Sequence, residues 1–292
     1  MVKAVVGVIG GSGVYDLPGL AITREEQIST PWGAPSDALR FGRINTVDVV
    51  FLPRHGRGHV HSPSGINYRA NIDALKRAGV TDIISVSACG SFKPELSPGT
   101  FVFVDQYVDR TVGRASSFFG NGCVAHVSMA HPVAPRLVAR LVAAAEAEKI
   151  RHHKGGTYVC MEGPQFSSYA ESIAYKAQGF DVIGMTAMPE AKLAREAEIS
   201  YATVAMVTDY DCWHPEHDAV DVASVIKVAH ENAAAAARLL ARVLSTFPAE
   251  HEPCPVRSDC ALDGAIMTHP NMRDPALLAK LDAVTSRLNK SA

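Results

Sequence analysis

The chain has 292 residues, of which 47% are hydrophobic and 20% charged. It is therefore long enough to bury a large core and too apolar to be mainly disordered. Its 28 Lys and Arg and 30 Asp and Glu give a formal net charge of -2, a balance that argues against a general nucleic-acid binder. No apolar run approaches the roughly 20 residues of a membrane helix.

The N-terminal segment and the cysteines both point to a cytoplasmic protein. Residues 1–13 combine a short apolar run with a glycine-rich turn, a pattern typical of a strand and not of a signal peptide. The six cysteines are dispersed without a C-x-x-C motif, which predicts mostly reduced thiols. A disulfide or metal site at Cys254 and Cys260 is the less favoured alternative.

Strands and helices are predicted to alternate along the chain. Apolar runs predict strands over residues 2–9, 47–52, 81–87, 100–107, 156–160, 182–185 and 200–207. Helical spacing of apolar residues predicts helices over residues 66–78, 135–149, 168–178, 189–197, 221–244 and 275–288. This alternation predicts an α/β fold with a mixed central β-sheet flanked by helices.

We expect a single domain with a C-terminal extension. Residues 1–247 carry the alternating elements, whereas the composition changes after residue 247 to Pro, Cys, Asp and His. Residues 248–292 are therefore interpreted as a loop and a final helix, which we expect to pack near the active site.

Polar groups follow four of the predicted strands, where ligands bind in open α/β sheets. The segments are Gly10-Gly11-Ser12-Gly13, Arg54-His55, Ser87–Ser91 and Thr208–Asp211. The glycine turn could hold an anion through its amides or be an ordinary turn. It is not a G-x-G-x-x-G fingerprint, which argues against a dinucleotide-dependent reductase.

The side chains after the second and last strands suggest anion binding and acid catalysis. Taken alone, Arg54 is interpreted as a surface charge, although its permanently charged fork also suits phosphate. His59 and His61 follow closely, but no metal-ligand set accompanies them, and we expect no metal. If Asp209 and Asp211 are buried together, at least one pKa rises; otherwise they belong to a solvated turn.

Taken together, the motifs resemble a known enzyme family. GGSG, PRHGRGH, NYRANI, SACGS, EGPQFSSYAES, GMTAMPEAKLA and TDYDCWH occur in an order similar to that of the trimeric purine nucleoside phosphorylases. The similarity is greatest to the branch that cleaves S-methyl-5′-thioadenosine, and it covers about residues 5–244. It implies phosphorolysis of a purine nucleoside without an organic cofactor, with inorganic phosphate as co-substrate. It also implies a homotrimer, or a hexamer, without nucleic-acid or membrane partners.

The resemblance also implies the roles of individual residues. The phosphate-binding residues would be Ser12, Arg54, His55, Ser87, Ala88 and Thr186. The nucleoside-binding residues would be Ala88, Cys89, Gly90, Phe166, Ser167, Met185, Asp209, Asp211 and Val222. Asp209, Asp211, His55 and Ser167 would act in catalysis. His59 and Val222 are candidates for the 5′ end, and His126 with Leu277 or Leu278 would come from a neighbouring subunit.

The acidic residue at position 209 favours adenine as the base. Adenine presents an acceptor at N7 and a donor at N6, so a protonated Asp209 could donate to N7 and accept from N6. Relatives that prefer 6-oxopurines carry Asn there. The alternatives are a related phosphorylase for adenosine, methylthioinosine or 6-oxopurine nucleosides, and a non-catalytic nucleoside-binding protein.

Overall fold

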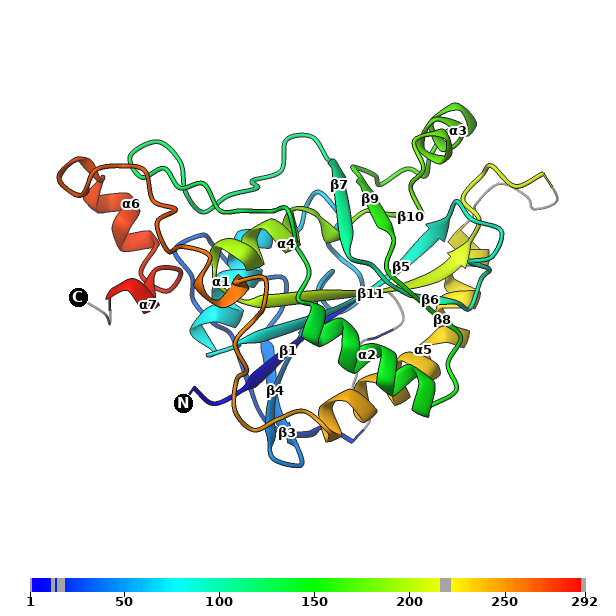
Figure 1. The fold of residues 1–292 in the computed structure, drawn as a ribbon, viewed down its shortest axis with the longest axis horizontal. Helices are drawn as coiled ribbons and strands as arrows, with labels where there is room; N and C mark the ends of the chain where they lie inside the picture. Colours follow the sequence, from blue (N-terminus) through cyan, green and yellow to red (C-terminus); the bar gives the residue numbers. More distant parts are fainter. Residues whose placement is uncertain (1, 12–13, 15–18, 216–221, 290–292) are drawn as a thin grey trace.

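The computed structural model describes residues 2–11, 14, 19–215 and 222–289. Within these residues, eleven strands form one mixed sheet with helices on both faces (Figure 1). This arrangement confirms the α/β fold expected from the alternating pattern. None of the helices among the described residues is both long and apolar enough to cross a membrane.

The strands of the sheet are mostly short. They are β1 (Val5–Gly10), β2 (Ala21–Glu26), β3 (Leu39–Ile44), β4 (Val47–Pro53), β5 (Asp82–Ser91), β6 (Phe101–Phe103), β7 (Gln106–Arg110), β8 (His152–Lys154), β9 (Thr157–Met161), β10 (Val182–Gly184) and β11 (Ser200–Asp209). The helices are α1 (Tyr68–Arg77), α2 (Pro135–Ala147), α3 (Tyr169–Ala177), α4 (Ala187–Glu196), α5 (Val222–Ser245), α6 (Pro275–Lys280) and α7 (Ser286–Asn289).

Four parallel strands bring the polar segments of the sequence to one edge of the sheet. Strand β1 pairs in parallel with both β4 and β5, and β5 pairs in parallel with β11. Their carboxyl ends therefore lie at the same edge, which is where ligands bind in such sheets. The sheet is mixed because β10 joins β5, β6 joins β11 and β3 joins β4 in the antiparallel sense.

Apolar side chains form a core on each face of the sheet. Helices α1 and α4 pack on one face, where Ile72, Leu75 and Leu193 are fully buried. Helices α2 and α5 cover the other face (Figure 1), with Leu141 and Leu240 among its buried residues. Because the central strands are buried on both faces, they appear in the sequence as continuous apolar runs.

Local capping signals explain where two of the helices begin. The Asn67 side chain accepts from the amide of Ala70 and caps α1. At α3, the Ser168 side chain accepts from the Glu171 amide, and the Glu171 side chain accepts from the Ser168 backbone. This reciprocal capping box satisfies two amides that the helix itself leaves unpaired.

Two predicted elements are each divided in the structure. The strand expected over residues 100–107 is instead two strands, since β6 pairs with β11 and β8 whereas β7 pairs with β9. The helix expected over residues 275–288 is interrupted after α6 and resumes as α7. In the strand, the break is a change of pairing partner, which the apolar pattern does not show.

Strands β2, β3 and β8 were absent from the sequence prediction. All six residues of β2 are exposed, so that strand lacks the alternation that marks a half-buried strand. Strand β8 is the polar tripeptide His152–Lys154. Strands β2 and β8 lie at edges of the sheet and are defined by pairing with one neighbour each. Strand β3 lies between β2 and β4 and buries Leu39 and Phe41, an alternation that the sequence prediction overlooked.

The C-terminal residues pack across the opposite end of the sheet from the polar edge. The His251 ring lies 3.1 Å from Asp82, at the start of β5. Arg195 of α4 donates to the Val256 carbonyl at 2.7 Å. Helices α6 and α7 lie far from α3 in Figure 1. Within one subunit this segment therefore does not cover the polar edge, and the division at residue 247 stays a prediction.

Candidate active site

A cavity of about 540 Å³ opens at the carboxyl edge of the parallel strands. Its walls come from the ends of β4, β5, β10 and β11 and from the first turns of α5. Thirteen of the predicted site residues line it: Arg54, His55, His59, Ser87, Ala88, Cys89, Gly90, Phe166, Met185, Thr186, Asp209, Asp211 and Val222. Tertiary folding thus brings together segments spread over almost 170 positions of the sequence.

Strand β5 orders the polar groups along the cavity. Arg54 contacts β5 at Ser85 and Val86, and Thr186 approaches it at Ser87. Asp209 is paired in register with Gly90. Because a strand rises about 3.3 Å per residue, Ser87 and Gly90 are separated by about 10 Å. This separation suits a ligand with an anion at one end and a planar base at the other.

Arg54 is fixed at the anion end by a buried ion pair. Its side chain is 1% exposed, and its Nε and Nη2 lie 2.8 and 3.1 Å from the two carboxylate oxygens of Glu190. Nη2 also donates to Ser85 Oγ at 2.6 Å, and Nη1 donates to the Val86 carbonyl at 3.0 Å. Among the described residues these contacts use four of the five guanidinium donors. One N–H of Nη1 remains for a ligand.

Glu190 has further partners that the sequence prediction missed. Its Oε1 accepts from Ser85 Oγ at 2.6 Å and from the Tyr201 hydroxyl at 2.8 Å. Burial disfavours the charged guanidinium, but Glu190 outweighs it and raises the pKa of Arg54. The cation therefore persists at any physiological pH while its formal charge is compensated. The signal was present in the quoted segment GMTAMPEAKLA, where Glu190 is an acid inside an otherwise apolar helix start.

His55 follows Arg54 and is almost fully buried at the cavity wall. Its Nδ1 lies 2.8 Å from the carbonyl oxygen of His61, and its ring stacks on that of His59 at 4.1 Å. Burial lowers the pKa of His55 to about 4. The ring is consequently neutral at neutral pH.

Hydroxyl groups complete the anion end. Ser87 Oγ lies 3.4 Å from Thr186 Oγ1 and 3.1 Å from the Ala88 carbonyl. Both hydroxyls are buried at the cavity surface. They can rotate to donate to an oxyanion without moving the backbone.

Two acidic side chains form the base end. Asp209 Oδ2 accepts from Thr208 Oγ1 at 2.7 Å, and Oδ1 accepts from the Asp211 amide at 2.8 Å. Burial raises the pKa of Asp209 to about 6 and also raises the pKa of Asp211. Neither acid has a cationic partner in the part of the chain that the structure describes. Asp209 is therefore close to accepting a proton near neutral pH.

A bulge and a glycine set the position of Asp209. The register between β11 and β5 shifts between Val207 and Asp209, and such bulges re-aim side chains beside functional sites. A Cβ atom on Gly90 would lie 2.8 Å from Asp209 Oδ1 and 3.2 Å from the Asp211 amide. Gly90 thus allows the carboxylate to lie directly against the backbone of β5.

Apolar groups line the middle of the cavity. Met185 follows β10, and Phe166 precedes α3 with 39% of its surface exposed. Gly163 has a φ of +66°, and a Cβ there would lie 2.4 Å from Met185 Sδ. The glycine is needed because the loop turns there and the thioether packs against it.

One face of α5 provides an apolar wall that the sequence prediction identified only at Val222. Val225, Ile226 and Ala229 also line the cavity, together with His230. The spacing 222, 225, 226 and 229 places the four apolar residues on one helix face. That spacing is visible in the sequence, and it was the available signal.

Arg114 is another residue that sequence reasoning missed. Its Nη1 donates to the carbonyls of Met185 and Met188 at 2.7 and 2.8 Å, and Nη2 donates to the Glu162 carbonyl at 2.6 Å. It also pairs with the Glu162 carboxylate at 3.4 Å. Arg114 thereby holds together the two loops that carry the middle of the cavity.

Several predicted residues are not part of the described lining. Ser167 is beside the cavity, with its Oγ 3.6 Å from Met161 Sδ and its carbonyl 3.4 Å from Cys212 Sγ. Ser12 lies outside the described residues. Of the predicted residues for a neighbouring subunit, His126 pairs through its amide with Ala265. Leu278 is 37% exposed on α6, away from this cavity.

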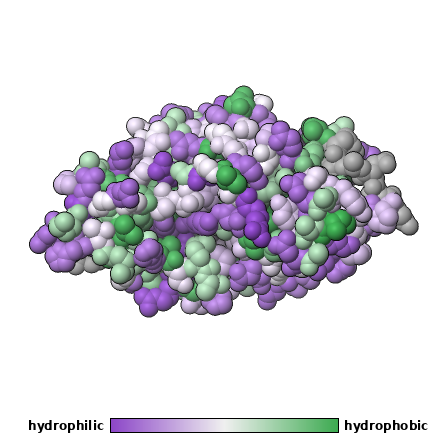
Figure 2. Space-filling model, turned by 90° about the horizontal axis from the view of Figure 1, so that it is seen from above, coloured by the Kyte–Doolittle hydropathy of each residue, from purple (hydrophilic) through white to green (hydrophobic). Residues whose placement is uncertain are grey.

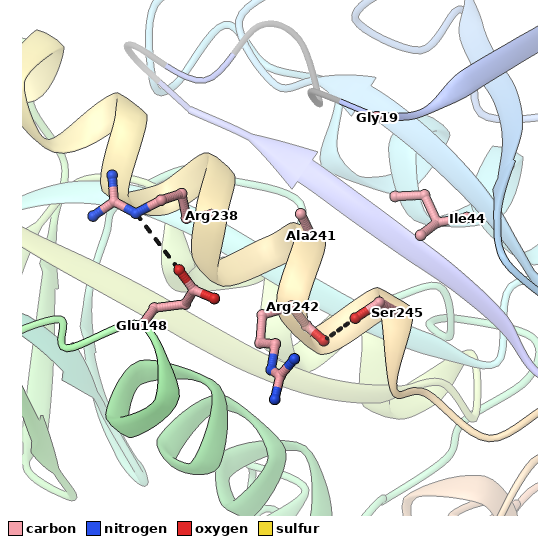
Figure 3. Close-up of a pocket in the computed structure, with 7 residues that line it drawn as sticks. All are labelled: Gly19, Ile44, Glu148, Arg238, Ala241, Arg242 and Ser245. Carbon is pink, nitrogen blue, oxygen red and sulfur yellow. Dashed lines mark hydrogen bonds and ion pairs between the residues drawn. The ribbon is translucent and has the colours of Figure 1, made fainter.

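A second hollow of about 370 Å³ lies beside the C-terminal half of α5 (Figure 3). Arg238 pairs there with Glu148 at 3.7 Å, and Ser245 Oγ donates to the Arg242 carbonyl at 2.9 Å. The Arg238 side chain is 55% exposed, so this hollow lacks a buried ion pair such as that of Arg54 and Glu190 in the first cavity. Figure 2 shows apolar side chains scattered in small groups over one face of the molecule.

The described residues contain no candidate metal-binding cluster. Among residues 2–11, 14, 19–215 and 222–289, no group of three or more His, Cys, Asp or Glu could hold a metal ion. The same part of the chain contains six free cysteines.

Comparisons with known proteins agree with this geometry. The chain is 68% identical to S-methyl-5′-thioadenosine phosphorylase of Bradyrhizobium diazoefficiens and 59% identical to that of Cereibacter sphaeroides, covering 99% of each chain. A methylthioadenosine phosphorylase from an antarctic soil metagenomic library superposes with a TM-score of 0.90 at 44% identity, covering 97% of this chain and 99% of that one.

A complex of a related protein contains a ligand of the expected kind. Methylthioadenosine phosphorylase from Schistosoma mansoni in complex with adenine matches with a TM-score of 0.87 at 36% identity, over 91% of this chain and 99% of that one. Residues 5–245 match the sequence profile of the phosphorylase superfamily. The chain therefore belongs to the phosphorylase superfamily.

Proposed function

We propose that this protein is an S-methyl-5′-thioadenosine phosphorylase. It transfers the 5-methylthioribosyl group from adenine to inorganic phosphate and releases adenine and 5-methylthioribose 1-phosphate. As a pentosyltransferase it uses phosphate as co-substrate and needs no organic cofactor. The single observation that carries the proposal is the order of groups along β5, with Arg54 and Thr186 near Ser87 and Asp209 opposite Gly90.

The anion end supports phosphate as the nucleophile. The free N–H of Arg54, the hydroxyls of Ser87 and Thr186, and the loop after β4 surround one end of the cavity. These groups hold the nucleophile beneath the sugar, so much of the acceleration comes from positioning and electrostatics. The bound anion also stabilises the oxocarbenium-like charge that develops at C1′ when the glycosidic bond breaks.

The acidic end supports adenine as the leaving base. A protonated Asp209 donates to N7 with one oxygen and accepts from the N6 amino group with the other. Burial raises the pKa of Asp209 to about 6, so a fraction of the protein carries this proton near neutral pH. The hydrogen bond to N7 stabilises the departing base as general acid catalysis does.

The wall formed by α5 supports the methylthio substituent. Val222, Val225, Ile226 and Ala229 present alkyl groups to the cavity. Alkyl groups favour a thioether over the hydroxyl of adenosine, because a buried hydroxyl without a partner is costly. His59 and His230 also line this cavity. Either of them could serve as a hydrogen-bond partner for the 5′ hydroxyl of adenosine, so we expect adenosine to be a slower substrate and not an inactive one.

Steady-state assays of nucleoside cleavage test the proposal. With phosphate present, we expect rapid release of adenine from methylthioadenosine, slower cleavage of adenosine and poor cleavage of inosine. Release of adenine without phosphate would contradict phosphorolysis, and a preference for inosine would contradict the role of Asp209. Binding of methylthioadenosine without any turnover would instead identify a nucleoside-binding protein.

We also propose that the protein is a cytoplasmic homotrimer in which a neighbouring subunit completes the cavity. Support comes from the exposed apolar side chains of Phe166, Val222 and Ile226 at the cavity and of Leu278 on α6. Light scattering coupled to gel filtration measures the mass of the assembly. A monomer or dimer at assay concentrations would contradict the proposal, and a hexamer would identify the alternative assembly that the resemblance also implies.

A further inference from the structure

The hydrogen-bonding state of His55 is determined by the loop that follows β4. The amide of His61 donates to the carbonyl of His55 at 3.0 Å. In return, the Nδ1 atom of His55 lies 2.8 Å from the carbonyl oxygen of His61. A carbonyl oxygen can only accept a hydrogen bond, so Nδ1 must carry a hydrogen. This reciprocal pair fixes both the orientation of the ring and the position of one of its hydrogens.

The ring does not carry a second hydrogen at neutral pH. Burial lowers the pKa of His55 to about 4, and Arg54, His59 and His61 act in the same direction because each is cationic when protonated. Only the hydrogen bond to the His61 carbonyl favours the imidazolium. The neutral ring therefore has its hydrogen on Nδ1 and a lone pair on Nε2.

At this end of the cavity the Nε2 atom can only accept a hydrogen bond, whereas its neighbours are able to donate. His55 lines the cavity, and no described residue forms a hydrogen bond with its Nε2 atom. The neighbouring groups are an N–H of Arg54 and the hydroxyls of Ser87 and Thr186. The charge of Arg54 is compensated by Glu190, so this end selects an anion by its pattern of donors and acceptors and not by net charge.

We propose that His55 binds phosphate as a hydrogen-bond acceptor, taking the single O–H of hydrogen phosphate on Nε2. The inference rests on the proposed function and adds the protonation state and orientation of the co-substrate. With its O–H turned toward His55, the anion presents its unprotonated oxygens to the donors and to C1′ of the nucleoside. The histidine thereby ensures that an unprotonated oxygen is the one that attacks.

The hydrogen remains on the anion when it binds. The hydrogen phosphate dianion, the form present above the second pKa of phosphate, loses its remaining hydrogen only in strongly alkaline solution. The pKa of His55 is about 4, so the ring is far too weak a base to take that hydrogen. The ring therefore acts by orientation and not as a base. Anions of the same charge and shape that lack a hydrogen would place an oxygen or fluorine against the lone pair. Leaving a buried acceptor unpaired should weaken binding roughly tenfold to a hundredfold.

Anion binding to the intact protein tests the inference. We would measure the affinities of phosphate, sulfate and monofluorophosphate at pH 8 by calorimetry, where all three are dianions. The wild-type protein should prefer phosphate over the other two at least roughly tenfold. His55→Leu should weaken phosphate binding and reduce the preference to within about threefold. The matched control Thr186→Val removes a donor, so it should weaken all three anions in similar proportion.

Two results would overturn the inference. Equal affinities of the wild-type protein for phosphate and sulfate would show that His55 does not accept a hydrogen bond from the anion. An equal loss of affinity for all three anions in His55→Leu would identify His55 as a donor. If His55→Leu fails to fold, nitrogen-15 NMR of the imidazoles decides, because a hydrogen on Nε2 instead of Nδ1 contradicts the proposal. These readouts need no nucleoside, so a protein that selects phosphate but releases no adenine overturns only the proposed function.

Discussion

Both ends of the cavity bury ionisable groups but treat them in opposite ways. At the anion end, Arg54 is paired with Glu190 and its donors are almost fully used. At the base end, Asp209 and Asp211 have no cation beside them, and burial raises the pKa of both. The comparison indicates that burial alone does not decide a charge state: a compensated group keeps its charge, whereas an uncompensated acid tends to hold a proton.

This difference matches the two tasks of a phosphorolysis. The anion end requires donors whose positions and protonation never change, because phosphate must be aligned in every cycle. The base end requires an acid that can share a proton with a departing purine. Substitutions that remove the acid of the base end or the counter-charge of the anion end therefore test this difference.

The largest effect is expected from removing the acid of the base end. Asp209→Ala should lower kcat/KM for methylthioadenosine roughly 10²- to 10⁴-fold, because the hydrogen bond to N7 is lost. Asp209→Asn should recover cleavage of inosine at the expense of methylthioadenosine, since an amide can donate to the 6-oxo group. Assays of both nucleosides with each variant measure this. Unchanged adenine selectivity in Asp209→Asn would contradict the assigned role.

Removing the counter-charge of the anion end should come next. Glu190→Ala leaves Arg54 buried without its partner and should destabilise the fold by about 3 to 5 kcal/mol. Glu190→Gln retains an acceptor for the guanidinium and should fold better, but with a raised KM for phosphate. Tyr201→Phe, which removes one donor to Glu190, is the mild control. If the variants raise the KM for nucleoside and phosphate equally, Glu190 does not position Arg54 specifically.

A pH-dependent stability difference should reveal the uncompensated acid. Because the pKa of Asp209 is raised from 3.8 to about 6 on folding, the folded state binds a proton that the unfolded chain releases. The stabilisation of the folded state by this proton is complete below about pH 4 and is lost as the pH rises through 6. Asp209→Asn should therefore gain about 2 to 3 kcal/mol over the wild type between pH 4 and 7.5.

Urea unfolding at pH 4.5, 6 and 7.5 measures that difference. Asp37 provides a matched control with the opposite sign, because hydrogen bonds from Arg57 and Ala38 outweigh burial and lower its pKa. Asp37→Asn should lose stability relative to the wild type as the pH rises. A constant difference between Asp209→Asn and the wild type would show that Asp209 titrates normally.

The smallest effect on catalysis is expected at the apolar wall that α5 forms, which carries no charged group among its described residues. Val225→Thr places a hydroxyl among alkyl groups at nearly constant volume. It should reduce the ratio of kcat/KM for methylthioadenosine over adenosine roughly fivefold, an energy of about 1 kcal/mol. Val112→Thr, at a residue 75% exposed and outside the cavity, should leave the ratio unchanged. Equal ratios in all three proteins would place the 5′ substituent elsewhere.

Much of the fold follows from the sequence because the central elements have strong local patterns. The apolar runs of β1, β4, β5 and β11 reflect burial on both faces of the sheet. The periodic apolar residues of α1, α2 and α5 likewise mark their buried faces. The edge strand β2, fully exposed, could not be found this way, because it owes its conformation to pairing with β3.

The sequence by itself determined the class of fold and the identity of the polar residues at the strand ends, because hydrophobic period and residue chemistry are local properties. Tertiary structure decided what those residues do. It paired Arg54 with Glu190, 136 positions away, and turned His55 Nε2 into an acceptor through the His61 carbonyl. It also placed Asp209 against Gly90 without a cation. Charge state and hydrogen-bonding role depend on neighbours in space, and those neighbours exist only after the chain has folded.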